Sequence, residues 1–274
     1  MLISKYQGCG NDFIITKEEE IIDKTYNDII KNVCNRHTGI GADGFIIVKQ
    51  EPLSMSYYNQ DGKEAPMCGN GLRCFVHYCY DENIQQDDKY EVMTKNGKLT
   101  IQRLSLHPFT VKINMGTWND TPSKIHVQKE TPLISYPLSI NNHIFPIYSF
   151  FLATIHTIVF VDELQDKNYY SYAADISRHK IFQKQTNVSF VNIINAGMLR
   201  VETYERGIGW TLSCGSGACA AARIAHEYKH CDTHITIITK GGILHVDIDH
   251  EHQIYLTGAS TRIMKGEYFY EYDD

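Results

Sequence analysis

The stretch CGNGLRCF, residues 68–75, recurs in the second half of the chain as CGSGACAA, residues 214–221. Each copy opens a segment whose composition favours a helix, predicted over 72–80 and 218–228. Each Cys-Gly-x-Gly therefore falls at a helix N-terminus, where unpaired backbone N–H groups gather. The helix dipole favours a thiolate there, and the glycines let backbone donors approach an anion closely. Cys68 and Cys214 are the candidate reactive groups.

The two copies predict two matching sites. If both helix starts face one small anionic ligand, the ligand lies between two thiols. Such an arrangement suits the inversion of a carbon centre, in which a proton leaves one face of a planar carbanion and another arrives on the opposite face. A plainer interpretation is turn chemistry with a buried cysteine beside a tight bend, and it stays open for either copy taken alone. Two copies at matching positions favour the paired thiols.

The composition is that of an ordinary globular protein, with 274 residues, 43% of them hydrophobic and 21% charged. No apolar run approaches the ~20 residues that a bilayer span needs. A net charge of −6 without a Lys/Arg cluster argues against a nucleic-acid surface. Residues 1–6 lead into a predicted strand without a signal-peptide core, so a cytoplasmic protein is expected, with no membrane partner.

The eight cysteines contain no Cys-x-x-Cys, so neither a zinc site nor a thioredoxin-type motif is predicted, and reduced thiols are expected. His226, His230 and His234 are spaced four apart, but Asp232-Thr233 should end the helix before the third of them. No metal site is therefore predicted. Gly39, Gly41 and Gly44 fit a dinucleotide fingerprint literally, yet a helix precedes them and a strand follows, which is the reverse of the required order.

The predicted elements occur in the order strands, helix, strands, central helix, strands, and this order appears twice. It favours a duplicated α+β architecture over alternating βαβ winding. The first half has strands over 4–6, 13–16, 45–49, 55–59 and between 90 and 115, with a helix over 26–35. The second half has a helix over 169–179 and strands over 132–139, 144–150, 155–162, 188–195, 198–205, 235–239, 244–248, 254–257 and 263–270.

With the repeat in view, several strings resemble those of one family. They are GCGNDF at 8–13, RHTGIGADG at 36–44, MCGNG at 67–71, TNV at 186–188, ERGIG at 205–209 and TLSCGSGACA at 211–220. In this order and over nearly the whole chain, the sequence resembles the diaminopimelate epimerases, which are cofactor-independent amino-acid racemases with two cysteine bases.

The resemblance implies two pseudo-symmetric lobes, each a strongly curved mixed β-sheet wrapped around a central helix. The lobes would comprise residues 1–116 with 261–274, carrying Cys68, and residues 117–260, carrying Cys214. It also implies a homodimer that needs no cofactor and converts LL-diaminopimelate to the meso form for lysine and peptidoglycan precursor synthesis.

The resemblance assigns roles residue by residue. Cys68 and Cys214 would be the acid/base pair, supported by His156 and Glu205. The expected substrate contacts are Asn11, Asn59, Gly69, Asn70, Asn187, Glu205, Arg206, Gly215 and Ser216. The backbone amides of the two helix starts would hold the carboxylate on the reacting carbon, whose charge rises as the carbanion forms.

Two positions depart from the family pattern. The family's Gly-Asn-Pro-His is Ala153-Thr154-Ile155-His156 here, and its Glu after Glu-Arg-Gly-x-Gly is Trp210. Thr154 and Trp210 are thus candidates for setting specificity, and a racemase acting on another amino acid is the alternative. Trp210 could equally pack behind the site and only tune the loop.

Two other classes of function are weighed. A cysteine hydrolase or acyltransferase would use Cys214 as nucleophile and His156 as base, but it leaves the Cys68 copy unexplained. A non-catalytic amino-acid-binding protein would keep the cleft without the chemistry. Deuterium exchange at Cα would identify the racemase, a trapped acyl-enzyme on Cys214 with Cys68 dispensable would identify the hydrolase, and tight binding without exchange would identify the binding protein.

Overall fold

A computed structural model describes residues 1–21, 26–65, 67–164 and 167–269 of the protein. The chain divides into two compact units, Met1–Ile113 with Gly258–Asp274 (unit 1) and Asn114–Thr257 (unit 2). The lobes expected from the family resemblance have their boundaries at residues 116 and 260. Within the described ranges, no helix combines the length and apolarity needed to cross a membrane.

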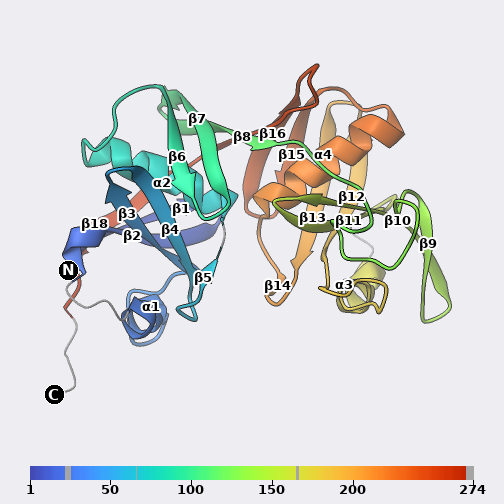
Figure 1. Cartoon of the computed structure of the whole chain (residues 1–274), viewed down its shortest axis with the longest axis horizontal. Helices are drawn as coiled ribbons and strands as arrows, with labels where there is room; N and C mark the ends of the chain where they lie inside the picture. The colour runs from blue at the N-terminus through green and yellow to red at the C-terminus, as the bar shows by residue number, and fades with distance from the viewer. Residues whose placement is uncertain (22–25, 66, 165–166, 270–274) are drawn as a thin grey trace. The chain divides into compact units, whose positions relative to one another are not determined.

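Unit 1 is a mixed sheet whose strands follow the order β18-β1-β2-β3-β4-β6-β7-β8 (Figure 1). The pairs β2–β3 and β4–β6 are parallel, and the other pairs are antiparallel. The bounds are β1 Leu2–Gly8, β2 Asn11–Lys17, β3 Gly44–Gln50, β4 Leu53–Asn59, β5 Glu64–Ala65, β6 Lys89–Thr94, β7 Gly97–Leu106, β8 Phe109–Gly116 and β18 Thr261–Glu267. The two-residue β5 pairs antiparallel with β4 at Tyr57 and Tyr58.

Unit 2 repeats this plan as β9-β10-β11-β12-β13-β15-β16-β17. Its parallel pairs, β11–β12 and β13–β15, occupy the same places as those of unit 1. The bounds are β9 Tyr136–Ile140, β10 His143–Leu152, β11 Thr154–Phe160, β12 Asn187–Asn195, β13 Met198–Glu205, β14 Gly209–Trp210, β15 His234–Thr239, β16 Gly242–Ile248 and β17 Ile254–Ala259. The predicted duplicated α+β fold is therefore confirmed.

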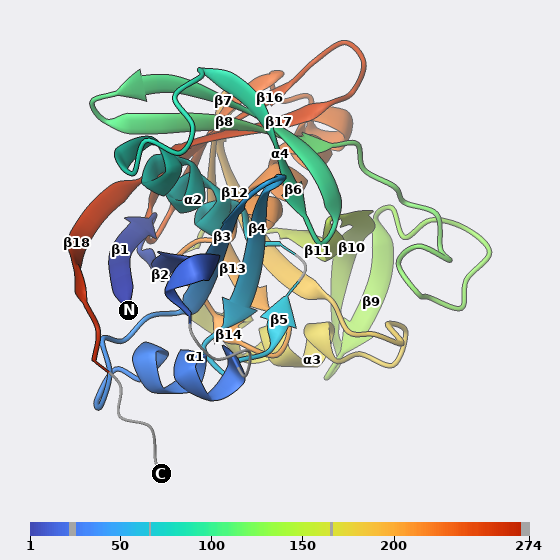
Figure 2. The same cartoon turned by 60° about the vertical axis from the view of Figure 1, so that its left-hand side comes forward.

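Each unit surrounds one long buried helix, α2 (Gly69–Asp81) in unit 1 and α4 (Gly215–Lys229) in unit 2. Side chains are buried nearly all round both helices, as expected for a helix enclosed by strands. Bulky residues such as Leu72 and Phe75 fill the space around α2, whereas α4 uses a run of alanines. Figure 2 shows α2 lying beside β1 and β18. Cys74 is fully buried in α2.

Some element predictions are wrong. The helix predicted over 169–179 is a 3-10 turn, η2 (Lys167–Tyr172), followed by the short α3 (Ala173–Ser177). Tyr169 explains the difference, because it is buried in the core of unit 2 and its hydroxyl bonds the Leu164 carbonyl at 2.7 Å. Tertiary packing thus overrides the helical pattern there. The strand predicted from 132 begins at Tyr136.

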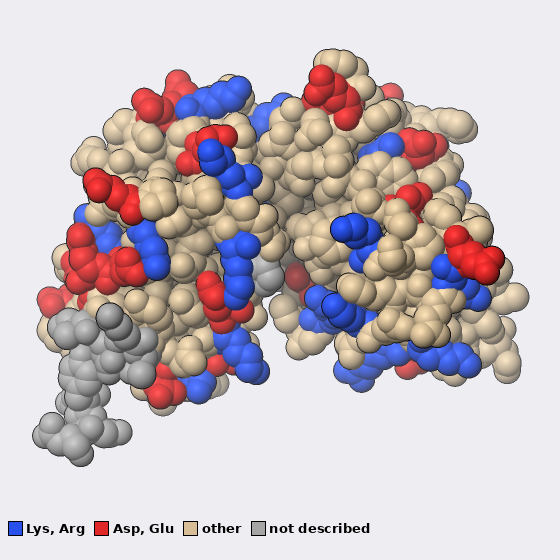
Figure 3. Space-filling model, in the orientation of Figure 1, with Lys and Arg blue, Asp and Glu red and all other residues tan. Residues whose placement is uncertain are grey.

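The other boundaries differ less. α1 spans Tyr26–Cys34, and a 3-10 turn, η1 (Glu18–Glu20), precedes it. The predicted strand 263–270 is β18, which ends at Glu267, and its predicted last residue Tyr270 lies outside the described residues. On the face of unit 1 shown in Figure 3, basic and acidic side chains are interspersed, in keeping with the low charge bias of the sequence.

Candidate active site

Cys68 is the N-cap residue of α2. Its backbone is extended (φ −133°, ψ 118°), and its sulfur accepts the backbone N–H of Gly71 at 3.4 Å. A β-carbon at Gly71 would lie 3.2 Å from Ile46 Cδ1 and 3.4 Å from Phe13 Cε1, so the helix start is pressed against β2 and β3. A thiol in this position takes the place of the usual Ser or Asp cap, where the helix dipole favours negative charge.

Cys214 caps α4 in the same way. Its φ and ψ are −119° and 111°, and its sulfur accepts the N–H of Gly217 at 3.4 Å. A β-carbon at Gly217 would lie 2.9 Å from Thr203 Oγ1 and 3.1 Å from Ser189 Oγ. The predicted placement of both cysteines at helix N-termini is confirmed. The side chains packed against the first turn are polar in α4 (Ser189 and Thr203) and apolar in α2 (Phe13 and Ile46).

The strand registers define which residues correspond between the units. Phe13 pairs with Gly44 across β2–β3, as His156 pairs with Asn187 across β11–β12. Two residues earlier, Asn11 of β2 corresponds to Thr154 of β11. Within the helix starts, Asn70 corresponds to Ser216. The predicted site residues therefore occupy matching places, with different chemistry in each unit.

In unit 1 the structure brings Asn11, Cys68 and Asn70 together. Asn11 Oδ1 lies 3.7 Å from Cys68 Sγ and 3.4 Å from Asn70 Nδ2. Asn11 begins β2 directly after Cys9 and Gly10, both of which have positive φ. Asn59 ends β4, and its Oδ1 accepts the Tyr57 hydroxyl at 3.0 Å.

Lys5, Asp12, Arg36 and Asp43 form a charged cluster next to Asn11, whose Nδ2 donates to Asp43 Oδ2 at 2.7 Å. Arg36 donates to both oxygens of Asp12, at 2.7 and 3.0 Å, and to Asp43 Oδ1 at 2.7 Å. Lys5 Nζ lies 2.9 Å from Asp12 Oδ2. Burial alone would raise the pKa of Asp12, but the hydrogen bonds from Arg36 and Lys5 outweigh it and lower that pKa to about 2. The carboxylate is charged throughout the neutral range.

In unit 2, Asn187 and Arg206 form one hydrogen-bonded group with Thr154. Asn187 Oδ1 accepts the backbone N–H of Arg206 at 2.8 Å. The Arg206 guanidinium donates to the Lys184 carbonyl at 2.7 Å and to Thr154 Oγ1 at 3.4 Å. Thr154 thus acts as an acceptor for Arg206, although its side chain is shorter than the amide in the family pattern.

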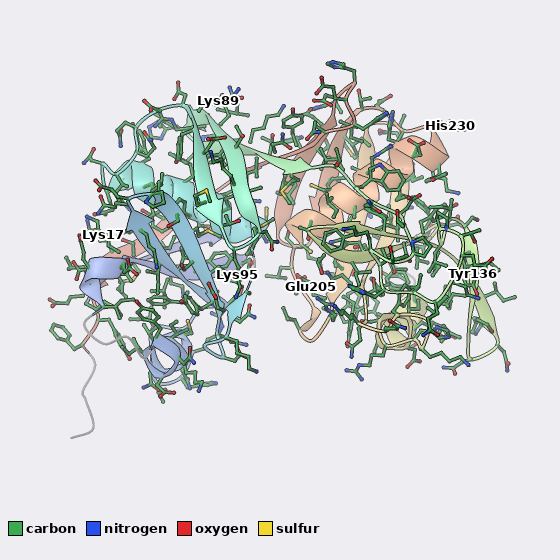
Figure 4. The ribbon with its side chains drawn as sticks, in the orientation of Figure 1. Lys17, Lys89, Lys95, Tyr136, Glu205 and His230 are labelled. Carbon is green, nitrogen blue, oxygen red and sulfur yellow. The ribbon has the colours of Figure 1, made fainter. Side chains whose placement is uncertain are left out.

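Glu205 and Trp210 flank the turn between β13 and β14. Glu205 Oε1 accepts the Thr211 hydroxyl at 2.8 Å, and Figure 4 shows Glu205 where β13 ends. The Trp210 ring lies 4.1 Å from that of Tyr170 and 5.7 Å from that of Tyr204, centroid to centroid. Trp210 is also partly buried against the hydrophobic core of unit 2. These contacts match the packing interpretation of Trp210.

His156 is fully buried in β11, and burial, with a smaller contribution from the Arg206 charge, lowers its pKa to about 3. The imidazole is neutral at physiological pH. Among the described residues, none forms a hydrogen bond with either ring nitrogen. In α4, Cys214 Sγ lies 3.6 Å from Ser216 Oγ.

Several contributors carried no role in the sequence prediction. Arg36 and Asp43 both lie within the RHTGIGADG string. A pair of opposite charges inside a glycine-rich loop is the sequence signal that could have identified them. Thr211, which donates to Glu205, gave no such signal. A surface cavity of about 430 Å³ in unit 2 contains no predicted site residue and is lined by Gln128, Lys129, Tyr136, His179, Lys180, Ile181 and Gln183.

Comparison with known proteins places the chain in a family. Residues 3–119 and 151–263 match the family model described as diaminopimelate epimerase. The diaminopimelate epimerase of Alkaliphilus metalliredigens (strain QYMF) is 36% identical over 96% of this chain and 96% of its own length. That of Clostridium perfringens (strain 13 / Type A) is 34% identical over 98% of this chain and 100% of its own.

Solved structures show the same fold at low sequence identity. A PhzF-family phenazine biosynthesis protein from Bacillus anthracis has a TM-score of 0.69 at 14% identity, covering 98% of this chain and 99% of its own. A probable proline racemase from Agrobacterium radiobacter K84 also has a TM-score of 0.69, at 11% identity, covering 98% and 93%. From its sequence matches, the chain belongs to the diaminopimelate epimerase family.

Proposed function

We propose that the protein inverts the Cα centre of an amino acid by a two-base mechanism, with Cys68 and Cys214 as the bases. The observation that carries the proposal is their equivalent position, each as the N-cap of the buried helix of its unit. One thiolate removes the Cα proton, leaving a planar carbanion. The other thiol delivers its proton to the opposite face, so the two sulfurs exchange protonation states in each turnover.

The carbanion would be stabilised at the substrate carboxylate. The backbone N–H groups of Gly69, Asn70, Gly215 and Ser216 are the proposed donors, since those at a helix start lack intrahelical partners. Fixed donors stabilise the transition state more than the ground state because the carboxylate gains charge as the proton leaves. The proposed chemistry uses neither pyridoxal phosphate nor a metal ion.

The proposed substrate is LL-diaminopimelate, converted to the meso form for lysine and peptidoglycan precursor synthesis. The names of the similar proteins support this substrate. Arg206 can bind a second carboxylate through parallel hydrogen bonds, with Asn59, Asn187 and Glu205 as further polar contacts. His156, held neutral, and Glu205 would support the thiols. We also infer a cytoplasmic homodimer, as in the family resemblance.

A racemase for another amino acid is the second candidate. It is favoured by Trp210, which brings a bulky indole to the β13–β14 turn, next to Glu205. The packing of Trp210 on Tyr170 and Tyr204 favours the first candidate, since it directs the ring into the core of unit 2.

Isotope exchange tests the proposal. Folded, reduced protein is incubated in deuterated water with LL-diaminopimelate and, separately, with each proteinogenic L-amino acid. We expect deuterium to appear at Cα of diaminopimelate. We expect kcat/KM to favour diaminopimelate by a factor of about 10³ or more. An amino acid without the far carboxylate would leave Arg206 unpaired in the complex, which disfavours its binding. Absence of exchange with every compound would refute the proposal, and a better substrate among the others would support the second candidate.

A further inference from the structure

The segment 206–213 connects β13 to Cys214, the N-cap residue of α4. The Thr211 N–H donates to a carbonyl of β13 at 3.2 Å. The Leu212 carbonyl accepts the Gly241 N–H at 2.8 Å, which ties the segment to the turn between β15 and β16. Because the segment begins with a proposed substrate contact and ends next to a proposed base, its position bears on both.

Trp210 anchors this segment by its side chain. The indole packs against the hydrophobic core of unit 2. Ile208 and Leu212, the other large apolar side chains of the segment, are 69% and 52% exposed. The Trp210 ring lies 4.1 Å from the Tyr170 ring, centroid to centroid, at an interplanar angle of 35°. A group that fixes the Tyr170 ring therefore also helps to fix Trp210.

Glu202 on β13 binds two groups that contact Trp210. The Tyr170 hydroxyl donates to Glu202 Oε2. Lys240 Nζ lies 2.7 Å from the same oxygen and donates to the Tyr170 hydroxyl. It also lies 4.7 Å from the centroid of the Tyr170 ring and 5.9 Å from that of Trp210, within the range of a cation–π interaction. One carboxylate thus holds a ring and an ammonium group against the indole.

The charges of this group persist at neutral pH. Burial acts to lower the pKa of Lys240, but the hydrogen bonds to Glu202 and Tyr170 outweigh it and raise that pKa. Burial and the bond to Glu202 both raise the pKa of Tyr170, so its hydroxyl keeps the proton that it donates. An isolated, exposed ion pair would contribute little. This pair differs because the Glu202 side chain is only 12% exposed and Lys240 lies over two rings.

We propose that Glu202 and Lys240 are positioning residues, which hold Trp210 and with it the segment 206–213 in the arrangement that substrate binding requires. The inference rests on the proposed function, in which Arg206 binds the far carboxylate of the substrate. The residue that follows Lys240 is the one whose N–H bonds the segment, so two adjacent residues of one turn hold it, by a side chain and by the backbone. Neither Glu202 nor Lys240 is expected to contact the substrate.

The test is hydrogen–deuterium exchange of backbone amides, read by peptide mass spectrometry on the full-length protein without substrate. In Lys240→Met and in Glu202→Gln, the amides of the segment 206–213 should exchange about fivefold faster or more, because local opening becomes easier. Peptides from unit 1 should exchange at the wild-type rate.

Two control variants separate positioning from a general loss of stability. Lys240→Arg keeps a cation that can pair with Glu202 and cover the rings, so the segment should exchange within about twofold of the wild-type rate. Asp247→Asn breaks the His234–Asp247 ion pair between β15 and β16 and should leave the segment unchanged. Wild-type exchange in both Lys240→Met and Glu202→Gln, or an equal acceleration of all peptides of unit 2, would overturn the inference.

Steady-state kinetics gives a second measurement. In Lys240→Met, kcat/KM for LL-diaminopimelate should fall about tenfold, mainly through KM, and Lys240→Arg should restore most of it. An unchanged KM in a variant whose segment exchanges faster would also overturn the inference. Amide exchange needs no substrate, so the two proposals fail separately. Absence of deuterium at every substrate Cα refutes the proposed function, whereas unchanged amide exchange refutes the positioning role.

Discussion

Asn187 Oδ1 accepts the backbone N–H of Arg206 at 2.8 Å, which fastens the start of β12 to the turn that follows β13. The bond joins β12 and β13, which pair antiparallel, and continuing their register places Asn187 opposite Glu205. The side chain proposed to bind the far end of the substrate thus depends on a neighbouring amide for the position of its backbone.

Replacing that amide should loosen Arg206 without removing it. We expect Asn187→Leu to lower kcat/KM for LL-diaminopimelate by about 10- to 100-fold, mainly through KM, because the bond that positions Arg206 and the proposed contact of Asn187 with the substrate are both lost, at about 1–3 kcal/mol in all. Steady-state kinetics checks this. Asn192→Leu is the matched control, since Asn192 lies on the same strand and bonds the carbonyls of Val161 and Asp162. An equal loss in both variants would contradict the specific role.

Each thiol should be indispensable for inversion. Cys68→Ala and Cys214→Ala should each lower the rate of conversion of LL- to meso-diaminopimelate by about 10³-fold or more, since one base cannot serve both faces of the carbanion. Chiral chromatography of the product measures it. Cys231→Ala is the control, a buried thiol just beyond the far end of α4. Near wild-type inversion by Cys68→Ala would rule out the two-base mechanism.

His156 should make the fold acid-sensitive. Its pKa falls from 6.5 to about 3 on folding, so the unfolded chain binds the proton more readily and stability decreases as pH falls through that window. At pH 5 the loss is about 2 kcal/mol. Denaturant unfolding at pH 7 and pH 5 should show a smaller drop for His156→Gln than for the wild type by roughly that amount. Identical drops in both proteins would show that His156 does not titrate as expected.

Comparison of the two proteins isolates His156 from the other groups. Burial also lowers the pKa values of His77 and His179, but both residues are present in wild type and variant alike. Asp12, with a folded pKa of about 2, loses its contribution only below its ordinary pKa of 3.8, outside the range compared.

Trp210 should act on stability more than on substrate choice. Trp210→Phe keeps an aromatic ring against Tyr170 and should leave the preference for LL-diaminopimelate unchanged. Trp210→Glu puts a carboxylate into the same aromatic contacts and should cost about 1–3 kcal/mol of unfolding free energy. Thermal melts and kcat/KM ratios decide it. If Trp210→Glu instead changes which amino acid has the highest kcat/KM, the Trp210 ring sets substrate specificity.

The sequence predicts the repeated elements well because each carries its own local signal. The Cys-Gly-x-Gly strings mark both helix starts, and alternating apolar residues mark most strands. The stretch from 167 to 177 is mispredicted because Tyr169 is drawn into a core assembled from residues distant in the chain. The two-residue strands β5 and β14 are too short to produce a periodic pattern.

The candidate site was predictable in its residue types but not in its hydrogen bonds. Asn11 and Arg206 are identifiable from their motifs, whereas their partners Asp43 and Thr154 depend on strand register and loop geometry. The partner of a polar side chain is selected by tertiary distance, for which a single sequence carries no direct signal. The packing of the polar side chains of Ser189 and Thr203 against Gly217 is another such feature.

The pairing of β18 with β1 also bears on the order in which the two units can fold during synthesis. Backbone bonds join the first residues to the last described ones, including Tyr268 N–H to the Met1 carbonyl at 2.9 Å, and Figure 2 shows the two strands side by side. Unit 2 is a single uninterrupted segment, Asn114–Thr257. A chain emerging from the ribosome therefore contains all of unit 2 while β1 is paired with β2 but still lacks its other neighbour, β18. The half that begins translation is the half that finishes folding last.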